Sequence, residues 1–180
     1  LDCLISSSAT MRAGLTQAVH QARHRSAFGR PLVEQSAMRN VLADLAVESE
    51  AATVLAMRVA RSYDQGAAGV EGANAFRRLA TAVAKYWVCK RAPGHAAEAL
   101  ECLGGNGYVE ESGLPRIYRD APLNSIWEGS GNVAALDVLR ALTREPECLP
   151  AFLAECDLAA GADRRLDAHL SETRSRLAGL

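Results

Sequence analysis

The feature that most constrains the fold is a long stripe of apolar residues that recur three and four positions apart. This spacing predicts one amphipathic helix from about Val33 to about Asp64, because residues three and four apart lie on the same helix face. The glycine-containing segment 65–69 then ends the helix. The residues of the stripe are Met38, Val41, Leu42, Leu45, Ala52, Leu55, Ala56 and Val59.

Two more long segments are compatible with helices. One covers residues 4–25, and the other covers residues 76–103, where Pro93 and the glycine after it are expected to introduce a kink. The glycine-rich turn 104–107 ends this third helix, and we expect it to need positive φ angles.

The rest of the sequence predicts shorter elements. Residues 108–132 show little periodicity and contain two prolines, so we expect a loop. A fourth helix is expected at residues 133–143, and two short helices follow at about 148–158 and 163–178.

These elements predict an all-α fold. Three long helices and one shorter one that fold back on each other form an antiparallel, up-down four-helix bundle in residues 1–144, with a short helical extension at 145–180. Hydrophobic residues make up 49% of the chain but aromatic residues only 5%, so Ala, Leu and Val must build most of the interior. This composition favours closely packed helices over a β-sandwich.

Charge and cysteine content argue against several classes of protein. With 20 basic and 21 acidic residues the net charge is −1, so DNA binding would need a local basic patch. The five cysteines form no CxxC pair, which argues against a disulfide framework or zinc site and favours a reducing setting. We find no secretory leader and no long apolar run, and therefore expect a soluble, cytoplasmic protein that does not interact with membranes. The absence of an initial methionine suggests part of a larger protein.

The most specific stretch is the segment 101–111, ECLGGNGYVEE. A glycine-rich turn after a helix exposes backbone N–H groups, which suits a phosphate or a nucleotide edge. The same turn can serve only to stop a helix. It is not a dinucleotide-binding fingerprint, because the third glycine is missing and a helix rather than a strand precedes it. From the residues alone, both interpretations remain open.

Continued through Arg116 and Asp120, this stretch resembles the second signature of the acyl-CoA dehydrogenase family. Residues 25–32, RSAFGRPL, resemble the family's turn between the first two helices of its C-terminal domain, and residues 126–130, IWEGS, resemble its I-Y/W-E-G-T/S segment. The matches occur in the family's order within residues 4–144. The resemblance implies the C-terminal helical domain of an FAD-dependent acyl-CoA dehydrogenase.

Finer details resemble the bacterial alkylation-response branch of this family. These details lie in the segments 89–91, 110–116, 124–132 and 136–140. The helices expected after residue 144 are similar to the extra C-terminal helices of that branch, but the segment is shorter. Members of that branch are reported to bind DNA. The branch therefore implies an alternative function, a DNA-associated flavoprotein with little dehydrogenase activity.

The resemblance places Glu128 at the position of the catalytic base. Removal of a weakly acidic α proton requires a carboxylate in a dry pocket and donors to the thioester oxygen, one of which would be the backbone N–H of Glu128. Trp127 would form a wall of the substrate pocket that keeps water out. The alternative for Glu128 is a capping box with Ser125, but the glycine that follows Glu128 disfavours a helix start there.

The resemblance also implies flavin contacts. Arg25 and Phe28 would reach the flavin of a neighbouring subunit, Arg25 at its pyrophosphate. Gly104 and Gly105 would lie along the adenosine part of that flavin. Ser130 and Asn132 would donate to the flavin of their own subunit. Without the resemblance, Arg25 reads as a solvated charge or C-cap donor and Asn132 as an N-cap.

The sequence departs from the family pattern in two places. After the catalytic Glu-Gly, the common T-S-E/Q-I-Q-R is SGNVAA at residues 130–135, which lacks the basic residue. The usual glutamine eight residues after the phenylalanine is Ser36 here, with Gln35 one place early. Some members place the base instead on the first helix, just upstream of where this chain begins. Asp2 is the only acid near that position, and a carboxylate upstream of Leu1 could compete with Glu128. His20 and His24 have helical metal-ligand spacing but lack a third ligand, so no metal site is expected.

Three functions are therefore compared. The first is an oxidoreductase acting on CH–CH groups, with FAD as cofactor and an acyl-CoA or related thioester as substrate. The second is the DNA-associated flavoprotein, for which the clusters Arg23, Arg25, Arg30, Arg39 and Arg164, Arg165, Arg174, Arg176 are the candidate contacts. The third is an oligomer core, since domains of this family assemble into homodimers and homotetramers. Because this chain holds only half of the flavin site, we expect the isolated chain to bind FAD poorly.

Overall fold

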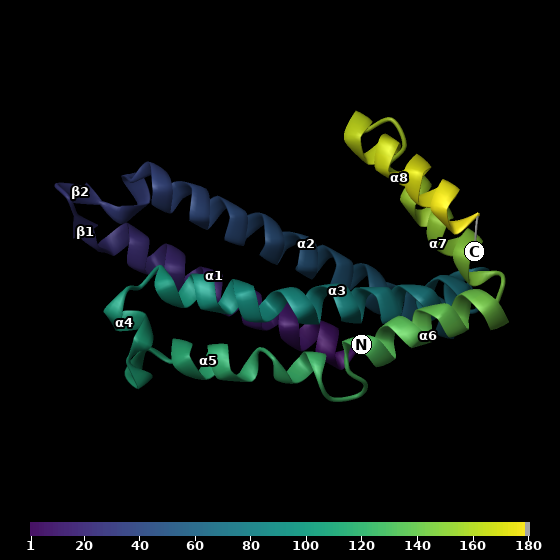
Figure 1. Ribbon diagram of the computed structural model, residues 1–180, viewed down its shortest axis with the longest axis horizontal. Coiled ribbons are helices and arrows are strands. Elements are labelled where there is room, and N and C mark those ends of the chain that lie inside the picture. Colours follow the sequence, from purple (N-terminus) through teal and green to yellow (C-terminus); the bar gives the residue numbers. More distant parts are fainter. Residues whose placement is uncertain (179–180) are drawn as a thin grey trace.

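The computed structural model describes residues 1–178, which form helices, one short hairpin and the segments that connect them (Figure 1). The helices are α1 (Asp2–His24), α2 (Ser36–Ala67), α3 (Ala73–Glu101), α4 (Gly105–Tyr108), α5 (Leu114–Asp120), α6 (Gly131–Arg144), α7 (Cys148–Asp157) and α8 (Arg164–Leu177). Three 3-10 turns are η1 (Leu32–Glu34), η2 (Glu110–Ser112) and η3 (Leu123–Ser125). The hairpin pairs β1 (Ser26–Ala27) with β2 (Arg30–Pro31) in antiparallel register. No helix within these residues is both long enough and apolar enough to cross a membrane.

Helix α3 is the centre of the bundle. It packs against α1 and α2, and it also contacts α5, α6 and α7. Helices α5 and α6 follow each other along α3 and together take the place of the fourth helix (Figure 1). The predicted all-α bundle is therefore confirmed, with its fourth member divided in two. Pro93 does not interrupt α3, which is continuous to its C-terminal end.

The predicted loop at residues 108–132 is wrong in part, because α5 lies inside it. Pro115 occupies the first turn of α5, where its missing N–H removes no intrahelical hydrogen bond. Gly113, with φ +75°, directly precedes this helix and turns the chain into it. Proline thus starts a short helix here instead of excluding one.

The glycine-rich turn also differs from its prediction. Only Gly104 has a positive φ, +59°, and the next residues form the single helical turn α4. Gly107 is required for close packing, since a Cβ added there would lie 2.1 Å from the carbonyl oxygen of Leu100. These glycines therefore serve two needs, a left-handed backbone at one position and a close backbone approach at another.

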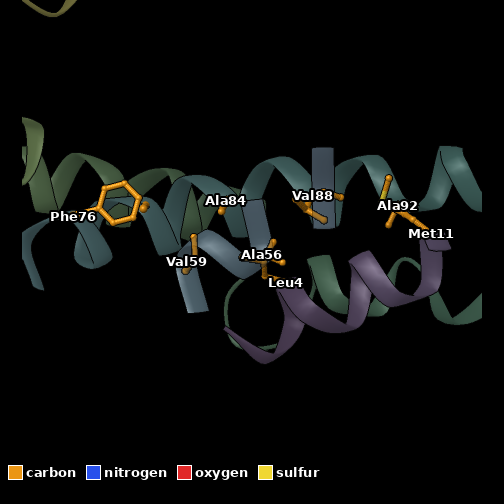
Figure 2. Close-up of a cluster of buried hydrophobic side chains, with 10 residues drawn as sticks. Leu4, Met11, Ala56, Val59, Phe76, Ala84, Val88 and Ala92 are labelled. Atoms are coloured by element: carbon orange, nitrogen blue, oxygen red, sulfur yellow. The ribbon is translucent and has the colours of Figure 1, made fainter. Parts of the chain in front are cut away.

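The core is built largely from small side chains, as the composition predicts (Figure 2). Ala52 and Ala56 of α2 are fully buried, and Ala84 and Ala92 of α3 are buried to within 1%. Small residues at these positions allow α2 and α3 to approach closely. The buried members of this cluster are Leu4, Met11, Ala52, Ala56, Val59, Phe76, Ala80, Ala84, Val88 and Ala92.

The helices α7 and α8 project from one end of the bundle (Figure 1). Arg58 of α2 binds the carboxylate of Glu155 in α7 through two hydrogen bonds of 2.5 and 2.6 Å. The same guanidinium lies 4.0 Å from the ring centroid of Phe76, and Phe76 stacks with Phe152 of α7 at 6.1 Å. One arginine thus joins α7 to both α2 and α3.

Candidate active site

The candidate base lies in a short loop between η3 and α6. Glu128 has φ +54°, a left-handed conformation that is uncommon for a residue with a side chain, and Gly129 follows with φ +105°. The Ser125 hydroxyl donates to the carbonyl of Pro122 at 2.9 Å instead of capping a helix. The expectation that no helix starts at Ser125 is confirmed. Helix α6 begins after the loop with Ser130 as its N-cap residue, so the N-cap reading of Asn132 is wrong.

The carboxylate of Glu128 has one hydrogen-bond donor, the thiol of Cys3. The distance between Cys3 Sγ and Glu128 Oε2 is 3.2 Å, and Cys3 comes from the first turn of α1. Burial raises the pKa of the Cys3 thiol, and the hydrogen bond and negative charge of Glu128 raise it further. Cys3 therefore stays protonated and able to donate at neutral pH.

A lysine of α3 holds the backbone on both sides of Glu128. Lys85 Nζ donates to the carbonyl oxygen of Trp127 at 2.9 Å and also to that of Gly129. A buried or half-buried ammonium needs such oxygen partners, and the two carbonyls need donors. The loop is consequently attached to the centre of α3.

Glu128 lines a cavity of about 490 Å³ that lies between α2, α3 and α6. Its other lining residues are Leu1, Tyr63, Arg77, Arg78, Thr81, Ala82, Lys85, Val133, Ala134, Leu136, Asp137 and Arg140. Arg78 is fixed in the wall by two 2.9 Å hydrogen bonds to Asp137 and one of 2.9 Å to Glu145. Glu128 is exposed in this chain.

Trp127 lies outside the cavity wall and is 52% exposed. Its indole Nε1 donates to Oδ1 of Asn124 at 3.1 Å, and Asn124 is buried. Asn124 therefore fixes the orientation of the indole beside Glu128.

Four of the candidate flavin contacts lie elsewhere. Arg25 is the C-cap residue of α1, directly before β1, and Phe28 lies in the turn between β1 and β2, where it has φ +54° and is 95% exposed. Gly104 directly precedes α4, and Gly105 is the first residue of α4. A Cβ added at either glycine would meet no atom within 4 Å. The hairpin and α4 occupy the same end of the bundle (Figure 1). Two backbone N–H groups of this turn are already used, because Gly104 donates to the carbonyl of Glu101 and Gly107 to the carbonyl of Gly104, each at 2.9 Å.

The departures from the family pattern have structural counterparts. Gln35 precedes α2 and donates through Nε2 to the carbonyl of Ala27 at 3.1 Å, so it supports the hairpin from within the chain. Ser36 is the first residue of α2 and is exposed. Asp2 is exposed as well, and its neighbour Cys3 makes the contact with Glu128.

The described residues contain one group whose potential metal-ligand atoms lie within 4.8 Å of one another, Glu145, Glu147 and Cys148. Glu145 is already paired with Arg78. The rings of His20 and His24 are tilted by 33° with their centroids 4.3 Å apart, and His24 Nδ1 lies 2.8 Å from the carbonyl of His20. Glu145 and His24 therefore already have partners within the chain.

The acyl-CoA dehydrogenase C-terminal domain family matches residues 2–143. The chain belongs to this family. AidB of Escherichia coli (strain K12) is 49% identical over 144 residues, which cover 80% of this chain and 26% of AidB. Acyl-CoA dehydrogenase family member 11 of Caenorhabditis elegans is 31% identical over 172 residues, which cover 94% of this chain and 28% of that protein.

Solved structures agree with this assignment. Caenorhabditis elegans ACDH-11 in complex with C11-CoA has a TM-score of 0.84 at 30% identity, over 96% of this chain and 30% of that one. Butyryl-CoA dehydrogenase of Megasphaera elsdenii has a TM-score of 0.68 at 29% identity, over 79% of this chain and 35% of that one. The chain thus spans about a quarter to a third of the length of these proteins.

Within this acyl-CoA dehydrogenase domain, the structure brings only some of the predicted site residues together. Glu128 and Ser130 share one loop, and Asn132 lies in the first turn of α6 beside it. The hairpin and the Gly104 turn form a second group at the end of the bundle (Figure 1). Sequence reasoning missed Cys3 and Lys85, although Lys85 is one of only two lysines in the chain.

Proposed function

We propose that the full-length protein oxidises the CH–CH bond of an acyl-CoA or related thioester, with Glu128 as the base that removes the α proton. The observation that carries the proposal is the placement of its carboxylate. A loop with a left-handed residue, attached to α1 and α3, directs Glu128 to a cavity in a domain of the acyl-CoA dehydrogenase family. Trp127 is assigned to the substrate pocket, where a second domain would complete the exclusion of water.

FAD is the cofactor in this proposal, and when bound it accepts the hydride from the β carbon. Ser130 and Asn132 would hold it through donors at the start of α6, where free N–H groups favour an anion. Arg25, Phe28, Gly104 and Gly105 fit a second flavin, because the exposed hairpin and the open turn share one end of the bundle. Two separate half-sites require a homodimer or homotetramer.

All five cysteines are free thiols, which supports a cytoplasmic location.

The test is reduction of the flavin in the full-length protein by a panel of acyl-CoA thioesters under anaerobic conditions. At least one thioester is expected to bleach the flavin, and Glu128→Gln should slow this reaction by about 1000-fold or more, because the amide cannot accept the α proton. Asp2→Asn is the matched control and should react at the wild-type rate. Equal rates for wild type and Glu128→Gln would contradict the role of Glu128.

The alternative, a DNA-associated flavoprotein of the alkylation response with little dehydrogenase activity, is favoured by the 49% identity to AidB. Of the C-terminal arginines, Arg165, Arg174 and Arg176 are already paired with acidic neighbours. The arginines at the hairpin end, Arg23, Arg25, Arg30 and Arg39, are exposed and are the better candidates. A salt-dependent gel shift of duplex DNA that disappears when Arg23 and Arg39 are changed to Gln would support this function.

A further inference from the structure

The conformation of Glu128 needs support from outside its own loop. A left-handed backbone at a residue with a side chain is uncommon and persists where the surrounding structure fixes it. The flanking carbonyl groups, those of Trp127 and Gly129, both receive hydrogen bonds from Lys85 Nζ. The ammonium group therefore joins the Trp127–Glu128 peptide, directly before Glu128, to the Gly129–Ser130 peptide, one residue beyond it.

Lys85 differs from the other cations of the chain in what it binds. Every ion pair among residues 1–178 uses arginine. Both partners of Lys85 are backbone carbonyls. The residue lies near the middle of α3 and is half-buried. A compact ammonium with three donors can serve two converging carbonyls, whereas the planar guanidinium fork is larger and suits a carboxylate.

The cation also lies close to the partner of the carboxylate. Its charge lowers the pKa of Cys3, the thiol that donates to Glu128 Oε2, in opposition to the larger effect of burial. Lys85 thus lies in the same cluster as the reacting carboxylate while its hydrogen bonds go to the backbone.

We propose that Lys85 is a positioning residue, which fixes the Trp127–Gly129 turn so that the Glu128 carboxylate meets the α carbon of the substrate. This inference rests on the proposed function. It assigns to Lys85 no contact with substrate or cofactor. Because a displacement of about 1 Å can cost about 100-fold in rate, loss of the two hydrogen bonds should act mainly on the chemical step.

The test compares variants of the full-length flavoprotein. Lys85→Met, which keeps much of the side-chain length but no donor, should reduce the rate constant of flavin reduction by about 100-fold, while the Kd of the thioester changes less than about threefold. Lys85→Arg should recover part of the lost rate, because it restores a donor. Arg61→Met is the control, since Arg61 is an exposed cation on α2 and does not line the cavity beside Glu128. It should react at the wild-type rate.

A double-substitution cycle separates positioning from general stability. If Lys85 acts through the carboxylate, Lys85→Met should cause little further loss in a Glu128→Gln background. Multiplied losses in the double variant would overturn the inference, as would a wild-type rate for Lys85→Met. Should Lys85→Met fold poorly or lose FAD, the same cycle is run with Lys85→Leu, which also lacks a donor. Little further loss in the Glu128→Gln background is again expected, and multiplied losses would overturn the inference.

These outcomes also distinguish the two proposals. If Glu128→Gln retains the wild-type rate, the proposed function fails. If Glu128→Gln is slow and Lys85→Met is fast, only the positioning role of Lys85 fails.

Discussion

At the scale of single residues, the contact between Cys3 and Glu128 gives the sharpest prediction. Burial is the largest reason for the raised pKa of Cys3, and the hydrogen bond and charge of Glu128 come next. Glu128→Gln removes the charge, so the pKa of Cys3 should fall but stay above its ordinary value. The pH dependence of alkylation at Cys3, followed by mass spectrometry, measures this shift. An unchanged midpoint would show that the thiol and the carboxylate are not in contact.

A second residue, Cys102, predicts how stability depends on alkaline pH. Burial, followed by the charges of Glu98 and Glu101, raises its pKa to about 11. A raised pKa in the folded state stabilises the protein below the unfolded value near 9, and this stabilisation is lost as pH rises through 11. The free energy of unfolding should therefore fall by up to about 2 kcal/mol over this range. Urea titrations at several pH values give the free energy of unfolding as a function of pH. Cys102→Ala should make this dependence flatter between pH 9 and 11, and an equally steep dependence would contradict the raised pKa of Cys102.

At the scale of elements, the attachment of α7 depends on Arg58. Arg58→Met should remove the paired hydrogen bonds to Glu155 and weaken the docking of α7 by about 1–3 kcal/mol. Hydrogen exchange of the α7 amides measures this locally, with amides of α1 as the internal reference. Equal protection of α7 in both proteins would contradict the role of Arg58.

The same ion pair makes α7 sensitive to acid. The hydrogen bond from Arg58 is the main cause of the lowered pKa of Glu155. A lowered pKa contributes stability above the unfolded value of about 4.5, and this contribution disappears as pH falls through the folded value. Exchange in α7 should consequently increase below pH 4.5 before the bundle itself opens, and Glu155→Gln should abolish this pH dependence.

The long helices could be predicted from the sequence because their apolar stripes repeat over many turns. The predicted helix 33–64 corresponds to α2, and its stripe residues Leu42, Leu45, Ala52, Ala56 and Val59 are buried. Helix α5 could not be predicted in this way, since two turns are too short for a period and Pro115 looks like a helix breaker. Local signals alone do not tell whether a proline starts or ends a helix.

The candidate site was predictable only as far as its motif extends along the chain. Glu128 and Ser130 lie within one matched segment. Cys3, in contrast, is 125 residues from Glu128 in the sequence, and Lys85 is 42 and 44 residues from its two partners in the loop. Such contacts depend on how α1 and α3 pack, and neither residue has a pattern in its own neighbourhood that marks it. Only the rarity of lysine in this chain distinguishes Lys85.

At the scale of the whole molecule, the chain spans about a quarter to a third of its relatives, and the candidate flavin contacts form two groups. The isolated 180-residue chain should therefore bind FAD poorly and lack activity. Equilibrium dialysis with FAD checks this, with the full-length protein as the positive control. One tightly bound flavin per isolated chain would contradict the division of the site.

The claim that Glu128 is the base is tested most directly by exchange of the α proton alone. The full-length protein is mixed in D₂O with an acyl-CoA whose β carbon is replaced by sulfur, a compound that can lose its α proton but cannot give up a hydride. Mass spectrometry then follows deuterium uptake at the α carbon. Wild-type protein should catalyse uptake, and Glu128→Gln should reduce the rate to that of solution while binding of the thioester persists. Uptake at the wild-type rate in Glu128→Gln would show that another group removes the proton.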